Sequence, residues 1–436
     1  MTQTNPTTPD TDAPQPTILL LGGKRSLLLK AQKLGLTVLH MQIAKEFTPD
    51  QAELADLTVL LDYEDVDKAV EVARGLHTFR PFAAAVTITE WAQLATAHIN
   101  EALGLPGVSP RTVELVTDKF AMREALNAAG VGEVGAVRGR NRSDLTDFAS
   151  TYGYPFLIKP IAASGSYGVF RVSGPEDIDA VWEKLSALGL STFLVEEFLE
   201  GREIGVEVLT FGGRHVPLGC TDKEINADFM EVAHYSPAEL PSEQRAELFA
   251  FVGRVLDTLG VDEGASHTEL MLTAKGPKVI ETHTRRAGDR IGELTRRVYG
   301  IDMEAYTLGH PAGVLDALTE SPRPRLGASV RFFEAEPGIL REVRGAEEVR
   351  DKEDVVEFYV QFKAGDRVPP LRWALDRVGH VMVERPTAQE AFATATAYAD
   401  SLEWVVEPDT DEVPQPGGTS VPGHEIDQAA KFYPAG

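Results

Sequence analysis

One stretch of the sequence, residues 267–285, constrains the fold more than any other part of the chain. It reads His-Thr-Glu-Leu-Met-Leu-Thr-Ala-Lys-Gly-Pro-Lys-Val-Ile-Glu-Thr-His-Thr-Arg, and two apolar runs around a Thr-Ala-Lys-Gly-Pro segment are typical of two strands joined by a turn. A hairpin centred on Lys275 places Glu269 opposite Glu281. The same register pairs His267 with His283, and all four side chains share one face because side chains alternate along a strand.

This predicted pairing of two carboxylates suggests a metal site. Two carboxylates held close together resist ionisation unless a cation compensates their charge. Mg²⁺ is usually bound by one or two carboxylates together with substrate phosphates. We therefore expect Glu269 and Glu281 to hold Mg²⁺ or Mn²⁺, with Arg285 adding positive charge just past the strand. The alternative is a solvent-facing hairpin with ordinary surface acids.

A strand that ends in a lysine, followed by a loop of small residues, lies upstream. Residues 154–160 read Tyr-Pro-Phe-Leu-Ile-Lys-Pro, and residues 162–168 read Ala-Ala-Ser-Gly-Ser-Tyr-Gly. Small residues let backbone N–H groups approach phosphate oxygens, and a lysine supplies a point charge. The predicted phosphate contacts are Lys159, Ser164, Gly165, Ser166 and Gly168. A plain loop between two strands is the alternative.

Residues 192–203 form a further candidate site, in which an apolar strand runs into paired acids. The end of such a strand can offer backbone groups to the edge of an adenine and a carboxylate to ribose hydroxyls. The predicted nucleotide contacts are Glu196, Glu197, Phe198 and Glu203. The alternative is a strand that runs into a charged turn.

Taken in order, these motifs resemble the ATP-grasp superfamily of carboxylate–amine ligases. The resemblance covers roughly residues 17–405, and it is strongest to bacterial L-amino-acid (dipeptide) ligases of the bacilysin-synthetase type. Biotin carboxylase and D-alanine–D-alanine ligase are similar at a greater distance. The residues that carry the resemblance are Asp118-Lys119, Ile158-Lys-Pro160, the small-residue loop, Val195-Glu-Glu197, Gly201-Arg-Glu203, Thr221-Asp-Lys223, Glu231–Pro237, Glu269, Glu281 and Arg285–Ile291.

The resemblance implies a fold and a reaction. The fold is α/β and α+β: an ATP-grasp domain with an N-terminal Rossmann-like domain and a C-terminal α+β domain. The reaction is the ATP-dependent formation of an amide or peptide bond through an acyl phosphate, with release of ADP and phosphate. Small carboxylates and amines, expected to be amino acids, are the implied substrates. Alternatives are a biotin-carboxylase-like or purine-synthesis-like ATP-grasp reaction, or a non-catalytic ATP-binding regulator.

The resemblance also implies residue roles. Lys119, Lys159 and Lys223 would contact ATP, and Arg285 would stabilise the acyl phosphate. His234 or His283 would act on the incoming amine.

His283 is the position at which the chain departs from the family pattern, which has Glu-x-Asn where this sequence has Glu281-Thr-His283. An imidazole nitrogen suits Mn²⁺, Zn²⁺ or Co²⁺ better than Mg²⁺. His283 is therefore either a ligand for a softer metal or a donor to phosphate or substrate, and we favour the donor role.

Breaks in composition predict the division into domains. Strands alternate with helices before the Pro106–Pro110 segment, as in a parallel sheet, and Pro322–Pro324 marks a second boundary. Thr387 with Glu390 reads as a capping box that starts a late helix. The predicted parts are a disordered leader (1–16), a Rossmann-like domain (17–110), an ATP-grasp domain with the ATP and metal site (111–325), a C-terminal α+β domain (326–405) and a loosely ordered tail (406–436).

The composition excludes several classes of partner. The formal net charge of −25 argues against non-specific binding to nucleic acid or to anionic membranes. A single cysteine, Cys220, permits no intramolecular disulfide. No apolar run reaches the ~18 residues of a membrane span, and no basic region followed by an apolar core starts the chain. We expect a cytoplasmic protein, and a homodimer is left open.

Overall fold

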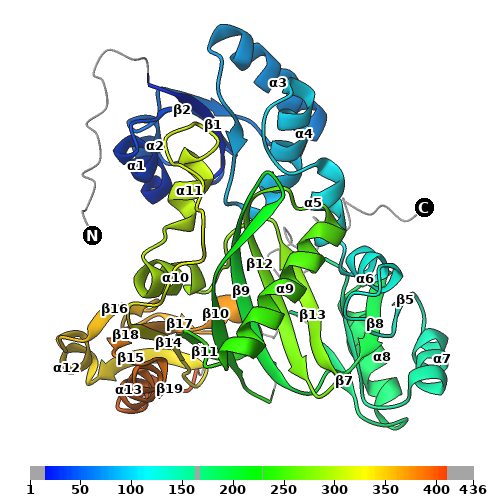
Figure 1. The fold of residues 1–436 in the computed structure, drawn as a ribbon. Coiled ribbons are helices and arrows are strands. Elements are labelled where there is room, and N and C mark those ends of the chain that lie inside the picture. Colours follow the sequence, from blue (N-terminus) through cyan, green and yellow to red (C-terminus); the bar gives the residue numbers. More distant parts are fainter. Residues whose placement is uncertain (1–14, 163–166, 228, 410–436) are drawn as a thin grey trace. The chain divides into compact units, whose positions relative to one another are not determined.

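The computed structural model describes residues 15–162, 167–227 and 229–409. These residues divide into two compact units, which are described one at a time (Figure 1). The first unit contains the described residues up to 110 together with residues 304–317, and the second contains residues 111–303 with those from 318 onward. Most of the predicted leader and tail lies outside the described residues.

The first unit is built on a parallel sheet with the strand order β3-β2-β1-β4, which confirms the predicted alternation of strands and helices. Leu19 and Leu21 of β1 pack into one apolar cluster, and Ile18 and Leu20 pack into another. Burial on both faces is typical of parallel strands. The elements are β1 (Thr17–Leu21), α1 (Arg25–Lys33), β2 (Thr37–Gln42), α2 (Pro49–Ala52), β3 (Leu57–Leu60), α3 (Val66–Phe79), β4 (Ala85–Val86), η1 (Glu90–Ala92), α4 (Gln93–Leu103) and α11 (Met303–Gly309).

Helix α11 joins this unit although it lies far along the chain. Leu308 is fully buried in the cluster beneath β1, and Glu304 forms an ion pair of 2.6 Å with Lys30 of α1. Apolar burial and one ion pair therefore hold residues 304–317 to the first unit.

The second unit contains a small antiparallel sheet with the order β5-β8-β6-β7. Its apolar core includes Phe156, Ile158, Phe193 and Val195, which are buried under helices α7 and α8. The elements are α5 (Pro110–Thr117), α6 (Lys119–Ala128), β5 (Ala136–Gly139), α7 (Arg142–Tyr152), β6 (Phe156–Pro160), β7 (Phe170–Val172), α8 (Asp177–Ala187) and β8 (Phe193–Glu197).

The larger sheet of this unit has eight strands in the order β13-β12-β9-β10-β11-β14-β18-β16, and every neighbouring pair is antiparallel. It continues across residue 325, because β11 pairs with β14. The elements are β9 (Arg202–Phe211), β10 (Arg214–Ile225), β11 (Glu231–Ser236), α9 (Ser242–Leu259), β12 (Glu263–Thr273), β13 (Gly276–His283), α10 (Ile291–Tyr299), β14 (Gly327–Phe333), β16 (Val355–Val360) and β18 (Gly379–Arg385).

A three-stranded sheet, β17-β15-β19, completes the second unit. Its elements and the adjoining helices are β15 (Gly338–Arg344), α12 (Ala346–Arg350), β17 (Arg367–Val368), η2 (Ala374–Asp376), α13 (Ala388–Asp400) and β19 (Glu403–Glu407). The capping box predicted at Thr387 and Glu390 is confirmed. Among the helices of the described residues, none combines the length and apolarity needed to cross a bilayer.

The β12–β13 hairpin has the predicted pairs but a different turn. Glu269 lies opposite Glu281, and His267 lies opposite His283. The turn contains only Ala274 and Lys275, so the strand ends pair as Thr273 with Gly276. A register shift after Glu269 leaves Ile280 as an extra residue, a β-bulge that restores the predicted alignment of the acids.

Candidate active site

A cavity of about 570 Å³ lies within the second unit, a size typical of small-molecule sites. Its walls come from the end of β6, the β8–β9 connection, the β10–β11 turn, the exposed faces of β12 and β13, the loop after β13 and the turn η2. Of the predicted site residues, the cavity wall contains Lys119, Lys159, Glu196, Phe198, Glu203, Glu269, Glu281, His283 and Arg285.

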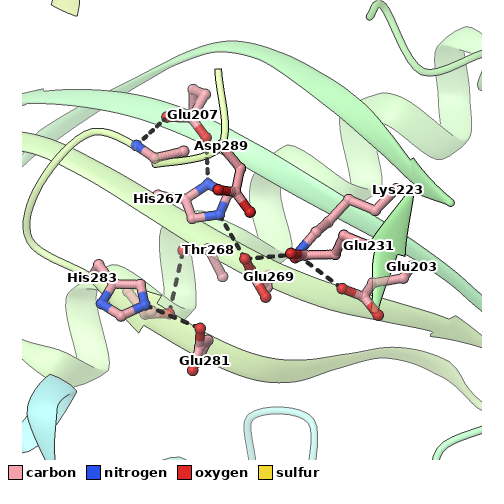
Figure 2. A network of polar contacts seen from close by, with 12 residues as sticks. Glu203, Glu207, Lys223, Glu231, His267, Thr268, Glu269, Glu281, His283 and Asp289 are labelled. Atoms are coloured by element: carbon pink, nitrogen blue, oxygen red, sulfur yellow. Dashed lines mark hydrogen bonds and ion pairs between the residues drawn. The ribbon is translucent and has the colours of Figure 1, made fainter. Parts of the chain in front are cut away.

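Lys223 ties together acids from three other strands of the sheet, as Figure 2 shows. Its Nζ atom lies 2.9 Å from Glu203 of β9, 2.6 Å from Glu231 of β11 and 2.7 Å from Glu269 of β12. Burial alone lowers the pKa of Lys223, but the three carboxylates outweigh it and hold the pKa well above its ordinary value. The Lys223 ammonium is already held by these three acids. Its contact with ATP stays a prediction.

The two predicted metal ligands lie on the cavity wall and carry cationic or imidazole partners. Glu281 accepts from Lys119 Nζ at 2.8 Å and contacts His283 Nε2 at 3.1 Å. Burial raises the pKa of Glu281, but Lys119 and then His283 bring it well below its ordinary value. Burial also raises the pKa of Glu269, but Lys223 and His267 together more than offset this and lower the pKa to about 2. Two ionised carboxylates on one wall suit a hard divalent cation.

Two other groups of side chains have ligand atoms within 4.8 Å of one another. The first, Glu203 with Glu231 and Glu269, surrounds Lys223. In the second, Glu231 and Asp289 both bond to Arg377, and His234 lies beside them. The acids of each group bond to side-chain cations, as Glu269 and Glu281 do to Lys223 and Lys119, and the metal site at Glu269 and Glu281 stays a prediction.

His267 acts as a bridge that the sequence did not reveal. Its Nδ1 atom bonds to Glu207 of β9, and its Nε2 atom lies 3.0 Å from Glu269 Oε1 (Figure 2). Burial lowers the pKa of His267, but Glu207 and Glu269 together outweigh it and raise the pKa to about 10, so the ring is an imidazolium at neutral pH. Glu207 also accepts the backbone N–H of Ala287 at 3.3 Å, in the loop after β13. The bridge therefore connects Glu269 to that loop.

His283 is nearly buried, and its ring lies parallel to that of His267, with centroids 6.5 Å apart. Its contact with Glu281 fits either of the two predicted roles, as a ligand or as a donor, and both stay predictions.

The predicted nucleotide strand is held by charges from both sides. Glu196 is buried and bonds to Lys159 at 2.5 Å and to Arg123 at 3.1 Å. Burial raises the pKa of Glu196, but Lys159 and Arg123 bring it below its ordinary value. The Glu196 carboxylate is therefore engaged by protein cations, as Glu203 is by Lys223, and the nucleotide contacts of both stay predictions. The apolar wall beside this strand is formed by Leu157, Leu199, Met271 and Ile280, which suits an adenine.

The carboxylate of Glu197 points elsewhere, since it accepts the backbone N–H of Gly135 at 2.5 Å. Only its backbone remains a candidate for contact with a nucleotide. Ser164, Gly165 and Ser166 lie outside the described residues. Gly168 has φ +70°, and a Cβ atom there would come within 3.0 Å of Pro160, which explains the need for glycine at the end of the loop.

His234 is not at the cavity surface, which corrects the prediction that it acts on the amine. Its side chain is fully buried behind the wall and meets the ring of Phe332 edge to face. Burial lowers the pKa of His234 to about 3, so the ring is neutral. The ring therefore lies behind the residues that line the cavity.

Besides the predicted Arg285, the loop between β13 and α10 contributes Asp289, which the sequence did not assign to the site. Arg285 and Asp289 both line the cavity. Arg377 bonds to Asp289 at 2.9 Å and to Glu231 at 3.1 Å, and its guanidinium lies 3.9 Å from the centroid of Phe332. The bonded partners lie 88 and 146 residues from Arg377 along the chain, so no local pattern could predict them.

Comparison with known proteins agrees with this geometry. Three family models match the chain: the ATP-grasp N-terminal domain over residues 28–107, the ATP-grasp domain over 152–293, and L-amino acid ligase C-terminal domain 2 over 331–407. A solved L-amino acid ligase from Bacillus licheniformis is similar with a TM-score of 0.78 and 23% identity, over 90% of this chain and 99% of that one. At that identity the likeness shows the fold.

Curated relatives are similar over part of their length. An uncharacterized protein, y4rH, of Sinorhizobium fredii is 25% identical over 70% of this chain and 65% of its own length. Alanine–anticapsin ligase of Bacillus subtilis is 27% identical over 49% of this chain and 50% of its own length. The chain thus spans between half and two thirds of these proteins. With its cavity, its ATP-grasp domains and its C-terminal domain of the L-amino acid ligase type, the chain belongs to the ATP-grasp ligases.

Proposed function

We propose that this protein is an ATP-dependent ligase that joins the carboxylate of one amino acid to the amine of another through an acyl phosphate, with release of ADP and phosphate. The pairing of Glu269 with Glu281 on one cavity wall, with Lys119 and Lys159 beside it, is the observation that carries the proposal. The match of residues 331–407 to an L-amino acid ligase domain favours amino acids as substrates.

The residues of the cavity suit phosphoryl transfer to a carboxylate, which depends on positioning and charge neutralisation rather than on covalent help from the protein. Lys119 and Lys159 place positive charge on the wall where the phosphates would lie. Arg285 would stabilise the acyl phosphate and the oxyanion that forms when the amine attacks. Glu269 and Glu281 would hold Mg²⁺ or Mn²⁺, which neutralises charge on the phosphates when bound.

Other reactions of the superfamily are the alternatives. Phosphoribosylglycinamide synthetase from Anaerococcus prevotii has a similar fold, with a TM-score of 0.68 and 18% identity. The similarity to the L-amino acid ligase structure is higher, and the C-terminal domain is of that type. A regulator that only binds nucleotide has no need of the paired carboxylates.

Turnover with a panel of amino-acid pairs tests the proposal. We expect ADP, phosphate and a dipeptide, identified by mass spectrometry, with at least one pair. Glu281→Gln should lose about a hundredfold or more in rate while keeping its fold, because metal-assisted charge neutralisation contributes several kcal/mol. Glu353→Gln, at an exposed position, is the matched control and should keep its rate. Release of AMP and pyrophosphate, or equal rates in the two variants, would contradict the proposal.

A further inference from the structure

We propose that Asp289 is the general base that takes a proton from the attacking amine, a role that rests on the proposed ligase function. An amino group is largely protonated at neutral pH and cannot attack until it loses a proton. Of the two histidines expected for this role, His234 is buried behind the cavity wall and neutral, and His283 contacts Glu281. Another group on the wall must therefore accept the proton.

Asp289 lies where such a base is needed. It lines the cavity in the same loop as Arg285, and about a third of its side chain (34%) is exposed. Glu269 and Glu281 belong to the same wall. Asp289 therefore lines the same cavity as the carboxylates that would hold the metal and the phosphates.

The surroundings of Asp289 make it more basic than an ordinary aspartate. Arg377 is shared by Asp289 and Glu231, so one positive charge faces two carboxylates. Burial, and then the charge of Glu231, raise the pKa of Asp289 more than Arg377 lowers it. Glu231 has Lys223 as a second cation, and its pKa lies below the ordinary value. His234 lies beside both acids, and the charge of Asp289 also acts on His380. Of Asp289 and Glu231, Asp289 is thus the better proton acceptor.

Asp289 is bonded to Arg377, but its side chain is 34% exposed, whereas the other paired acids and histidines of the cavity wall are 15% exposed or less. Glu203, Glu231 and Glu269 hold Lys223, and His267 is an imidazolium between two carboxylates. Glu281 holds Lys119 and contacts His283, while Glu196 holds Lys159 and Arg123. Glu200 lines the wall on the β8–β9 connection, beside the predicted nucleotide strand.

The backbone around Asp289 is also unusual. Asp289 and Arg290 have φ angles of +45° and +66°, in the left-handed region that favours glycine. Ion pairs hold the two residues there, Asp289 with Arg377 and Arg290 with Glu357 of β16. Backbone strain maintained by ion pairs at a cavity wall is typical of residues that a reaction needs in one place.

The step balances as follows. The ammonium gives one proton to the Asp289 carboxylate, and the nitrogen lone pair forms the C–N bond at the acyl carbon. The bond between that carbon and the phosphate oxygen breaks, and its electron pair leaves with phosphate. The second proton of the nitrogen passes to the departing phosphate, and Asp289 returns its proton to solvent.

Hydroxylamine distinguishes a general base from a residue that only holds the loop. It is unprotonated at neutral pH and attacks an acyl phosphate without a base. In Asp289→Asn we expect dipeptide formation to fall about a hundredfold or more, as general-base loss predicts. Hydroxamate formation from the same acid and ATP should stay close to the wild-type rate. Asparagine keeps the shape and tolerates a positive φ, so the loop is preserved. Glu353→Gln, at an exposed position, is the control and should keep both rates.

The outcomes are distinct. An equal fall of the dipeptide and hydroxamate rates in Asp289→Asn would show that Asp289 only holds the loop, and no fall in either would show that another group is the base. Both results overturn the inference and leave the proposed function intact. Failure of the wild-type protein to form any hydroxamate or release ADP with any acid would overturn the proposed function, and the inference with it.

Discussion

Many charged residues of the cavity are buried or partly buried and are bonded to a group of opposite charge. His267 is the clearest case, because its imidazolium lies between Glu207 and Glu269 at 3% exposure. Removing one partner from such a group leaves an uncompensated buried charge, which is strongly destabilising. These ion pairs therefore link the chemistry of the site to the stability of the fold.

Stability should fall at alkaline pH because of His267. Its pKa in the folded protein is about 10, above the ordinary 6.5. Protonated His267 therefore stabilises the folded protein by on the order of a few kcal/mol. This contribution is fully present below pH 6.5 and is lost as the pH rises through 10. Urea unfolding at pH 6, 8 and 10 should show this fall in wild type and a weaker one in His267→Gln. His215→Gln, on β10, is the control, and equal slopes in all three proteins would contradict the account.

Some residue roles followed from local sequence, and others did not. Strand alternation placed Glu269 and Glu281 on one face of the hairpin. The small residues of the loop that follows its strand pointed to Lys159. The partners of Glu196 and Glu231 come from distant parts of the chain, so no local pattern indicated that Arg123 or Arg377 would hold them.

At the scale of elements, the β12–β13 hairpin shows that the predicted residue pairs can be correct although the predicted turn is wrong. A turn centred on Lys275 needs an odd number of residues, whereas the observed turn has two, Ala274 and Lys275. The bulge at Ile280 compensates for the difference. Bulges depend on the neighbouring strands, and alternation alone cannot predict them.

The bulge also places Ile280 beside Glu281 on the cavity wall. Deletion of Ile280 should leave a regular hairpin in which Glu269 still faces Glu281, while the apolar wall loses one side chain. We expect the melting profile to be kept and the affinity for a fluorescent ATP analogue to fall roughly tenfold, since a buried aliphatic side chain contributes at least 1.4 kcal/mol. Unchanged affinity would show that the nucleotide does not contact this wall.

At the scale of the whole molecule, the eight-stranded sheet joins segments that the sequence separates. The predicted boundary near residue 325 follows a proline-rich segment, yet β11 on one side pairs with β14 on the other. Composition indicates where a chain can turn, but strand pairing decides which segments share a sheet, and the predicted division into domains stays a prediction.

A chain that ends at residue 325 should therefore fail to fold as an independent ATP-grasp domain. It would expose the hydrogen-bonding edge of β11 and lose Arg377, the partner of Glu231. Unpaired strand edges promote aggregation. Size-exclusion chromatography and circular dichroism should show aggregated or unfolded material. A monodisperse fragment that binds ATP would disprove this dependence.

The position of Lys223 has a consequence for how this sheet can change. Its three acids come from β9, β11 and β12, and Lys223 itself from β10, so one ammonium reports the alignment of four strands. A slip of one residue in any of them would turn an acid to the opposite face and leave the ammonium short of charge. The ion pairs of Lys223 therefore form only when all four strands are in the correct register. A chain that is misaligned here would lose them and should be inactive. Substitution of one of these four residues alone would leave a buried charge uncompensated, so changes at the four positions should occur together.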